Sequence, residues 1–170
     1  MKGKVVLVTG ANGGLGTYVT QAFLDAGSTV VGTSRKIQQS DFDNPNFTAL
    51  AAEISTREGA KTLVDQVVAR FGRLDVLAHT VGGFTGGQSI ADTDDATFQR
   101  MFDLNLNCVF HILRVAVPPL RKTGNGREDS FGFMYRDANS KHQIYDRMKT
   151  LWGQQWGGTV ASWANMDDGS

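Results

Sequence analysis

The stretch TGANGGLG, residues 9–16, decides the fold that we expect. Directly before it, KVVLV (4–8) contains the unbroken and mostly β-branched apolar run Val5–Val8, typical of a strand buried on both faces of a parallel sheet. Directly after it, apolar residues recur at helical spacing until Gly27, a residue that suits the end of a helix. The sequence therefore predicts a strand, a glycine turn and a helix in succession.

This context predicts a dinucleotide site at the glycine turn. Glycine has the backbone freedom for a tight turn, and it has no Cβ to keep a pyrophosphate away from backbone N–H groups. The N-terminus of the helix adds a partial positive charge. Gly10, Gly14 and Gly16 are the candidate glycines, and Leu15 would contribute its backbone. The alternative is a tight turn with a purely structural role.

The alternation of strands and helices continues to residue 127. Three further strands are expected, at residues 28–34, 47–53 and 74–83. Strand–helix–strand units of this kind predict an α/β fold. We expect a doubly wound, mostly parallel sheet of the Rossmann-like type, with helices on both faces.

Two later helices have recognisable ends. Ser55 and Glu58 have the spacing of a capping box that opens a helix, and Gly72 would end it. A longer helix is expected over residues 93–117, with Thr93 as its N-cap and Pro118-Pro119 as its stop.

The composition changes after Arg127. Residues 1–127 contain 29 Val, Leu and Ile, whereas residues 128–170 contain three. Because a parallel sheet needs branched aliphatic strands, we expect a dinucleotide-binding domain at 1–127 and a fold that is incomplete at its C-terminal side. Residues 128–170 form a divergent tail, either part of the same domain or poorly ordered. SFGFMY (130–135) alternates aromatic residues and is compatible with one strand.

Charge and composition exclude several classes of partner. Lys+Arg 17 balances Asp+Glu 17, so no overall field attracts nucleic acid or an anionic membrane. No apolar run reaches the roughly 18 residues of a membrane span. Cys108 is the single cysteine, and His79, His111 and His142 lack ligand spacing, so we expect neither a disulfide framework nor a metal site. These features predict a cytoplasmic protein.

The end of the strand at 28–34 bears on the choice of cofactor. An acidic residue there would bind the ribose 2′-hydroxyl of NAD, but the sequence reads GTSRK. Arg35 could instead pair with a 2′-phosphate through a charged hydrogen bond worth about 1.5–3 kcal/mol, and Ser34 could add its hydroxyl. We therefore expect NADP(H) to be favoured over NAD(H). The alternative is a solvated surface pair at a strand end.

The pattern Thr9-Gly10-x-x-x-Gly14-x-Gly16 resembles the glycine motif of the short-chain dehydrogenase/reductase family. The same stretch also fits the spacing of the extended branch of that superfamily, through Gly10, Gly13 and Gly16. Glu53, the segment AHTVGG (78–83) and Asn105 favour the compact single-domain branch. The resemblance covers residues 1 to about 127.

The resemblance implies roles for particular positions. Glu53 ends the third strand where similar proteins carry an aspartate over the adenine, and Asn105 matches the helix asparagine of the catalytic tetrad. His79 and Thr80 replace two asparagines of an Asn-Asn-Ala-Gly segment, and we interpret His79 as a hydrogen-bonded structural residue rather than a catalyst. The candidate cofactor contacts are Gly10, Asn12, Gly14, Leu15, Gly16, Ser34, Arg35, Glu53, Ile54, Thr80, Val81 and Gly82.

The tail contains the candidates for proton transfer. Tyr145 and Lys149, in QIYDRMK (143–149), have the Tyr-x-x-x-Lys spacing, and Tyr145 lies 40 residues after Asn105, close to the interval typical of the family. Ser130 is the hydroxyl nearest to the position of the serine that polarises the carbonyl. However, the aliphatic strand before that serine, the small residues that flank the tyrosine and the later substrate-closing segment have no counterpart here.

The resemblance implies an NAD(P)-dependent oxidoreductase that transfers hydride between a nicotinamide cofactor and a small carbonyl or alcohol substrate. The alternative is a catalytically inactive, truncated or frame-shifted relative that at most binds the cofactor. Similar proteins commonly form homodimers or homotetramers, and the helix at 93–117 would be available for this. Trp152, Trp156 and Trp163 are either interaction anchors or residues of a packed or disordered tail.

Overall fold

The computed structural model describes residues 1–85, 87–124 and 127–130, and for the last of these ranges it describes the backbone. These residues belong to one compact unit, Met1–Met134. Five strands form a single sheet in the order β3-β2-β1-β4-β5, and every neighbouring pair is parallel. The strands are β1 (Val5–Thr9), β2 (Thr29–Thr33), β3 (Phe47–Ala49), β4 (Val76–His79) and β5 (Arg127–Ser130).

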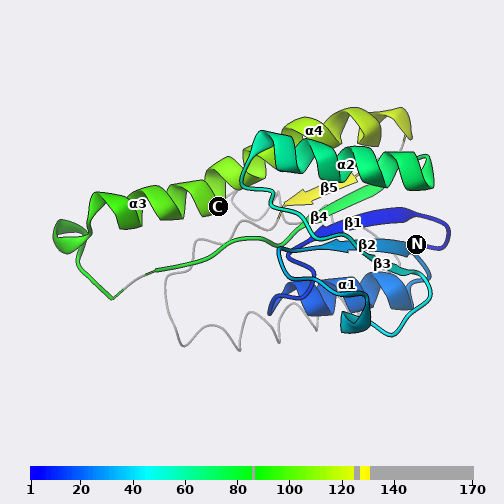
Figure 1. Ribbon diagram of the computed structural model, residues 1–170, viewed down its shortest axis with the longest axis horizontal. Helices are drawn as coiled ribbons and strands as arrows, with labels where there is room; N and C mark the ends of the chain where they lie inside the picture. The colour runs from blue at the N-terminus through cyan, green and yellow to red at the C-terminus, as the bar shows by residue number, and fades with distance from the viewer. Residues whose placement is uncertain (86, 125–126, 131–170) are drawn as a thin grey trace, which may run out of the picture. The chain divides into compact units, whose positions relative to one another are not determined.

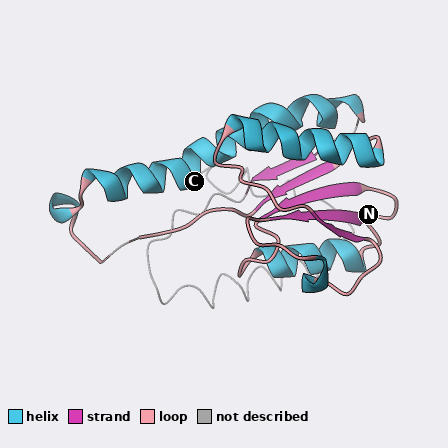
Figure 2. Cartoon of the chain, in the orientation of Figure 1, coloured by secondary structure: helices cyan, strands magenta, loops and turns pink. Residues whose placement is uncertain are grey.

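Helices cover both faces of this sheet (Figure 1). The helix α1 (Gly16–Asp25) lies on one face, and α2 (Arg57–Phe71) and α4 (Cys108–Lys122) lie on the other (Figure 2). The chain winds outward from β1 through β2 to β3 and then crosses back to β4 and β5. The prediction of a doubly wound, mostly parallel α/β fold is confirmed.

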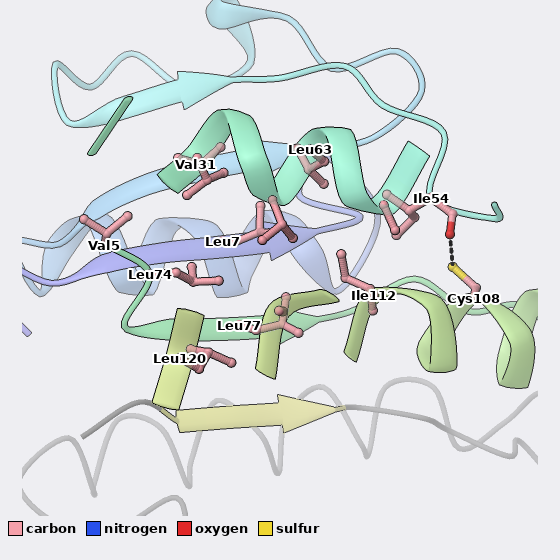
Figure 3. Packing of buried hydrophobic residues seen from close by; sticks show 14 residues of the cluster. Val5, Leu7, Val31, Ile54, Leu63, Leu74, Leu77, Cys108, Ile112 and Leu120 are labelled. Carbon is pink, nitrogen blue, oxygen red and sulfur yellow. Dashed lines mark hydrogen bonds between the residues drawn. The ribbon is translucent and has the colours of Figure 1, made fainter. Parts of the chain in front are cut away.

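A hydrophobic cluster lies between the sheet and the helices α2 and α4 (Figure 3). Val5 and Leu7 of β1 belong to this cluster, whereas the equally buried Val6 and Val8 alternate with them. Because successive strand residues face opposite sides of a sheet, β1 is buried on both faces, as its apolar run predicted. The cluster includes Val31, Leu63, Leu74, Leu77, Ile112 and Leu120.

The capping box predicted for the second helix is wrong by one residue. Thr56 is the N-cap of α2, and its side chain accepts a hydrogen bond from the Gly59 N–H at 3.1 Å. The Ser55 N–H instead donates to the Glu53 side chain at 3.1 Å. Gly72 ends α2 in the left-handed conformation, with φ of 72°, as expected.

The predicted helix at 93–117 differs from the structure at both ends. It begins as α3 (Asp95–Phe102), and its N-cap is Asp94, whose carboxylate accepts from the Thr97 N–H at 2.7 Å, rather than Thr93. A π-helical turn, η3 (Asp103–Asn107), joins α3 to α4. The helix then runs through Pro118 and Pro119 to Lys122. The prolines do not end it because Leu120, which is 3% exposed, anchors the last turn in the core.

The predicted strand boundaries also change. The strand expected at 47–53 ends at Ala49, although the Leu50 and Ala52 N–H groups still bond to the Gly32 and Ser34 carbonyls of the chain beside them. The strand expected at 74–83 is limited to β4. Two single-turn helices, η1 (Gln39–Asp41) and η2 (Ile90–Asp92), lie in the connections.

The sequence pattern did not indicate the strand at residues 127–130. The polar segment REDS forms β5 and pairs in parallel with β4. Main-chain hydrogen bonds make such a pairing, so it does not require aliphatic side chains. Of the strand proposed at 130–135, residues 131–135 lie outside the described part of the chain.

Candidate functional site

The connections that follow β1, β2 and β4 leave the sheet at one edge, where these parallel strands end. The strand order reverses between β1, which leads outward to β2, and β4, which leads to β5. In open α/β sheets, ligands bind outside the carboxyl ends of the strands at such a switch point. The candidate site therefore lies above β1 and β4.

The glycine turn after β1 packs tightly against the end of β4. Gly10 has φ of 73°, and its N–H donates to the Thr33 carbonyl at 2.7 Å. A Cβ on Gly10 would lie 2.9 Å from Thr80 Oγ1. A Cβ on Gly16 would overlap the Gly10 carbonyl oxygen and lie 2.9 Å from the same hydroxyl. Only glycine fits at these two positions without displacing backbone atoms.

The start of α1 is suited to an anion. This helix has neither a side-chain cap nor an acidic residue in its first turn. Asn12, Gly13 and Gly14 are exposed just before it, and Leu15 is half-buried at the N-cap. The positive end of the helix dipole is therefore not neutralised by the chain itself, which favours the binding of a phosphate group.

Asn12 ties the glycine turn to the connection between β2 and β3. Its Nδ2 donates to Asp41 Oδ2 at 2.9 Å, and the same oxygen accepts from the Gln38 N–H at 3.1 Å. The single turn η1 is thereby held beside the glycine turn.

The segment after β2 carries two exposed cations. Arg35 and Lys36 are exposed, and Arg35 forms no ion pair with another described residue. Ser34 is half-buried, and its Oγ accepts from the Lys36 N–H at 3.2 Å. The positive charge of Arg35 is thus available to a ligand at this edge.

Two adjacent residues after β3 differ in their exposure to solvent. Glu53 is exposed, whereas Ile54 is buried in the hydrophobic cluster. The Ile54 carbonyl accepts a hydrogen bond from Cys108 Sγ at 3.7 Å (Figure 3). Burial, together with the charge of Glu53, raises the pKa of the Cys108 thiol to about 11, so this cysteine is a packing residue rather than a nucleophile.

Asn105 fixes the loop after β4. Its Oδ1 accepts from the Gly83 N–H at 3.0 Å, and its Nδ2 donates to the Gly83 carbonyl at 2.9 Å and to the Met101 carbonyl at 2.9 Å. A Cβ on Gly82 would lie 3.1 Å from Asn105 Oδ1. The π-helical turn therefore presents Asn105 to the loop that the resemblance assigns to the cofactor, of which Val81 is half-buried and Gly82 exposed.

Thr80 and His79 lock the end of β4 to the end of β1. The Thr80 hydroxyl and N–H both donate to the Thr9 carbonyl, at 2.6 Å and 3.1 Å. His79 is 0% exposed, and its Nδ1 lies 2.7 Å from Thr9 Oγ1. Burial lowers the pKa of His79 to about 4, so its ring is neutral at pH 7. These contacts agree with the interpretation of His79 as a hydrogen-bonded residue.

The sequence analysis missed that His79 belongs to a row of polar residues across the sheet. Thr33, Thr9, His79 and Ser130 are successive register partners on β2, β1, β4 and β5, and each is the last residue of its strand. The signal in the sequence was the polar residues Thr9, Thr33 and His79, each of which lies within or directly after an expected strand. Ser130 is therefore placed at the same edge as the glycine turn.

The remaining proton-transfer candidates, Tyr145 and Lys149, lie outside the described residues. Within the ranges that the structure covers, no group of three or more His, Cys, Asp or Glu could hold a metal ion. Within the same ranges, no helix has both the length and the apolar character needed to cross a membrane.

Comparison with known proteins gives a family match. The family model described as short chain dehydrogenase matches residues 4–127. L-Fucose dehydrogenase of Bos taurus is 31% identical over 127 residues, which are 71% of this chain and 46% of that protein. The chain spans about half the length of the curated relatives that it matches.

Two similar solved structures contain a nicotinamide cofactor. A tyrosine-to-phenylalanine variant of ElxO with NADPH bound is 26% identical, with a TM-score of 0.71, and the match covers 76% of this chain and 55% of that one. The 3-ketoacyl-(acyl-carrier-protein) reductase of Brucella melitensis in complex with NADH is 25% identical, with a TM-score of 0.64, and the match covers 72% and 52% of the two chains.

Proposed function

Because the chain belongs to the short-chain dehydrogenase family, we propose that it is an NAD(P)-dependent oxidoreductase acting on a small carbonyl or alcohol substrate. The observation that carries the proposal is the glycine turn at residues 10–16, which is packed against Thr80 at the switch point of the sheet and followed by an uncapped helix. This arrangement offers backbone N–H groups and a helix dipole to a pyrophosphate.

The described residues fit such a cofactor. The glycine turn would hold the pyrophosphate, because Gly10, Gly14 and Gly16 have no side chain to cover its backbone. A Cβ at Gly16 would also overlap the Gly10 carbonyl oxygen. Glu53 would lie near the adenine, and Thr80, Val81 and Gly82 would lie along the nicotinamide half. When bound, the nicotinamide supplies or accepts the hydride. The protein binds and orients the cofactor and the substrate, and its side chains transfer the proton.

We propose that Tyr145 donates the proton to the substrate oxygen, or accepts it in the reverse reaction. Free tyrosine has a pKa of about 10, and bringing it near 7 takes about three units, or roughly 4 kcal/mol. A cation close by can supply much of this, and Lys149, four residues further along the sequence, is the candidate. Ser130, at the carboxyl edge of β5, would polarise the substrate carbonyl. Asn105 would act by holding the loop after β4 through its bonds to Gly83.

The preferred cofactor in this proposal is NADP(H). Arg35 is exposed and makes no ion pair with another described residue, and no acidic residue stands at the end of β2 to bind a ribose 2′-hydroxyl. The solved relatives with bound cofactor include one with NADPH and one with NADH, so the preference rests on Ser34 and Arg35 of this chain.

The decisive experiment is an assay of the purified chain with NADPH and a panel of small ketones. We expect consumption of NADPH, and we expect Tyr145→Phe to abolish it. Tyr135→Phe, which removes the hydroxyl of a tyrosine that is not among the candidate site residues, is the matched control and should leave turnover unchanged. Turnover that survives Tyr145→Phe would remove Tyr145 from the mechanism.

A second candidate function is cofactor binding without catalysis. The fall from 29 branched aliphatic residues before residue 128 to three after it favours a frame-shifted or alternatively spliced tail. NADPH that raises the melting temperature without being consumed would support this reading, because a ligand that binds only the folded state stabilises it. The frameshift would be contradicted if neither of the other two reading frames of the coding DNA encodes an aliphatic strand with a serine from codon 128 onward.

We also propose assembly into a homodimer or homotetramer through the helix at residues 93–117. One apolar side chain is exposed at every fourth position along this helix, and such contiguous apolar surface marks interaction sites. The residues are Phe98 (62% exposed), Phe102 (45%), Leu106 (51%) and Phe110 (56%). Light scattering should show a monomer after Phe102→Glu with Leu106→Glu, but not after Phe84→Glu, which alters an exposed residue outside the helix.

A cytoplasmic location remains part of the proposal. Cell fractionation with a tagged full-length chain would test it, and recovery of the chain in a membrane or secreted fraction would contradict it.

A further inference from the structure

The strand β3 forms one edge of the sheet, and its neighbour on the inner side is β2. The Asn46 carbonyl and the Leu50 N–H bond to main-chain groups of β2, at 2.9 Å and 3.0 Å. Main-chain groups of successive residues point alternately to the two sides of a strand, so those of Phe47 and Ala49 face the outer side. An outer row of unpaired N–H and C=O groups is a template for the addition of another strand.

Two of these outer groups bind the side chain of Gln39. Its Nε2 donates to the Phe47 carbonyl at 2.8 Å, and its Oε1 accepts from the Ala49 N–H at 3.0 Å. The Phe47 N–H donates to the Asn44 carbonyl at 3.0 Å. A side-chain amide offers the same donor and acceptor as a peptide group. In a parallel ladder, one residue bonds in this way to two residues of its neighbour that are two positions apart, so the amide takes the place of one residue of a further strand.

The short connection that carries Gln39 is fixed on both sides of the amide. Ile37 and Phe42, which flank η1, are each 6% exposed. Within η1, Asp41 accepts a hydrogen bond from Asn12 at 2.9 Å. The backbone of Gln39 is therefore held beside β3, and closing the amide onto the strand orders little more than one side chain.

We propose that Gln39 is an internal substitute for a neighbouring strand, and that it closes β3 to strand addition by a second copy of the chain. The strand itself has the sequence Phe-Thr-Ala, without the charged residues or proline that commonly protect an edge. In a second copy, β3 presents the same groups, so two edges without the amide can pair about a two-fold axis. This inference depends on neither the cofactor nor the activity.

The first test is hydrogen exchange of the Ala49 amide in the full chain at low concentration. Gln39→Ala should accelerate this exchange by about threefold or more, the factor that one hydrogen bond is worth. The Leu50 amide, which bonds to β2, should keep its rate. Ser40→Ala is the matched control, because Ser40 is exposed in the same turn and its side chain has no hydrogen bond among the described residues. An Ala49 rate that ignores Gln39→Ala would overturn the proposal.

The second test is sedimentation over a rising series of protein concentrations. Every chain carries Phe102→Glu with Leu106→Glu, so that assembly through the helix at residues 93–117 does not contribute. We expect the chain with Gln39→Ala to dimerise and its Ala49 amide to regain protection as the dimer forms, whereas the chain with the native Gln39 should stay monomeric. A Gln39→Ala chain that stays monomeric, or that dimerises without renewed protection of Ala49, would overturn the proposal.

Gln39→Lys separates the opening of the edge from its use by a second copy. A lysine cannot accept from the Ala49 N–H, so exchange should accelerate as it does in Gln39→Ala. A lysine on an edge strand opposes pairing, so this variant should stay monomeric. Dimerisation of Gln39→Lys would show that association does not use this edge and would overturn the proposal. If Gln39→Ala does not fold, the exchange of Ala49 in Gln39→Lys decides.

Discussion

The side chain of Asn105 pairs with both polar groups of Gly83: Oδ1 accepts from its N–H at 3.0 Å and Nδ2 donates to its carbonyl at 2.9 Å. This amide bridges the π-helical turn and the loop that follows β4. The loop at the carboxyl edge is therefore held by a side chain from a helix rather than by its own sequence.

Removing this bridge should loosen the loop. We expect Asn105→Ala to lower the free energy of unfolding by about 1–2 kcal/mol, because one donor, the Gly83 N–H, and two acceptors, the Gly83 and Met101 carbonyls, lose their partner. We also expect it to accelerate hydrogen exchange of the Gly83 amide. Asn107→Ala is the matched control, since that side chain bonds only to Asp103 among the contacts described. Unchanged exchange at Gly83 in Asn105→Ala would show that the bridge does not hold the loop.

The glycine turn should tolerate a methyl group at one position and not at another. Gly16→Ala would force a Cβ onto the Gly10 carbonyl, so we expect a loss of about 1–3 kcal/mol of stability and loss of NADPH binding. At Gly13 the new Cβ would lie 3.1 Å from the same oxygen, a milder contact that should preserve most of both. Denaturant unfolding and nicotinamide fluorescence measure the two effects, and equal behaviour of the variants would contradict the packing argument.

Cofactor choice should depend on Arg35. Loss of a charged hydrogen bond worth about 1.5–3 kcal/mol weakens binding by roughly tenfold or more, so Arg35→Ala should raise the Kd of NADPH by that factor and leave the Kd of NADH unchanged. Lys36→Ala, at the adjacent exposed cation, should have a smaller effect. Tighter binding of NADH than of NADPH to the native chain would refute the preference.

Stability should fall between about pH 6.5 and pH 4 because of His79. Burial lowers its pKa from 6.5 to about 4, so over this interval the unfolded chain binds a proton that the folded chain does not. Above pH 6.5 the neutral ring does not reduce the free energy of unfolding. As the pH falls toward 4, the free energy of unfolding decreases by about 3 kcal/mol at most. His79→Phe should remove this part of the pH dependence in urea unfolding; an unchanged slope would mean that His79 is not buried as a neutral ring.

A separate loss at lower pH is expected from Asp75. Burial by itself raises the pKa of this carboxylate. Hydrogen bonds from Arg73, the Val5 N–H and Lys4 together lower the pKa by more than burial raises it, so the pKa lies below the usual 3.8. Its contribution is present above pH 3.8 and lost below it. Asp75→Asn should therefore lower stability by a constant amount above pH 3.8 and remove this loss at lower pH, and a new pH dependence between pH 4 and 6.5 in this variant would contradict the assignment.

Local patterns in the sequence were sufficient for the first half of the fold. The β-branched run before Gly10 and the helical spacing after Gly16 depend only on near neighbours, and the structure bears them out. Gly72 was identified as a helix end for the same reason, since a left-handed terminus demands glycine whatever lies around it.

Contacts between distant positions were not visible in the sequence. The hydrogen bond between Thr9 and His79 joins residues 70 positions apart, and it appears only once β1 and β4 are neighbours. Likewise, β5 forms from a polar segment because β4 offers it a row of main-chain partners. The two prolines of α4 are accommodated because Leu120 beyond them is buried, a tertiary effect that outweighs local propensity.

The π-helical turn also keeps the exposed apolar side chains on one side of the helix. Four residues overshoot one α-helical turn by about 40°, so apolar side chains at every fourth position would drift steadily around the helix. A π turn contains more residues per turn, and Asp103–Asn107 thus counteracts the drift within the series Phe98, Phe102, Leu106 and Phe110. Deleting a single residue here would both rotate Asn105 relative to Gly83 and interrupt the apolar series. The length of this one turn therefore sets the hold on the loop after β4 and the outer surface of the helix together.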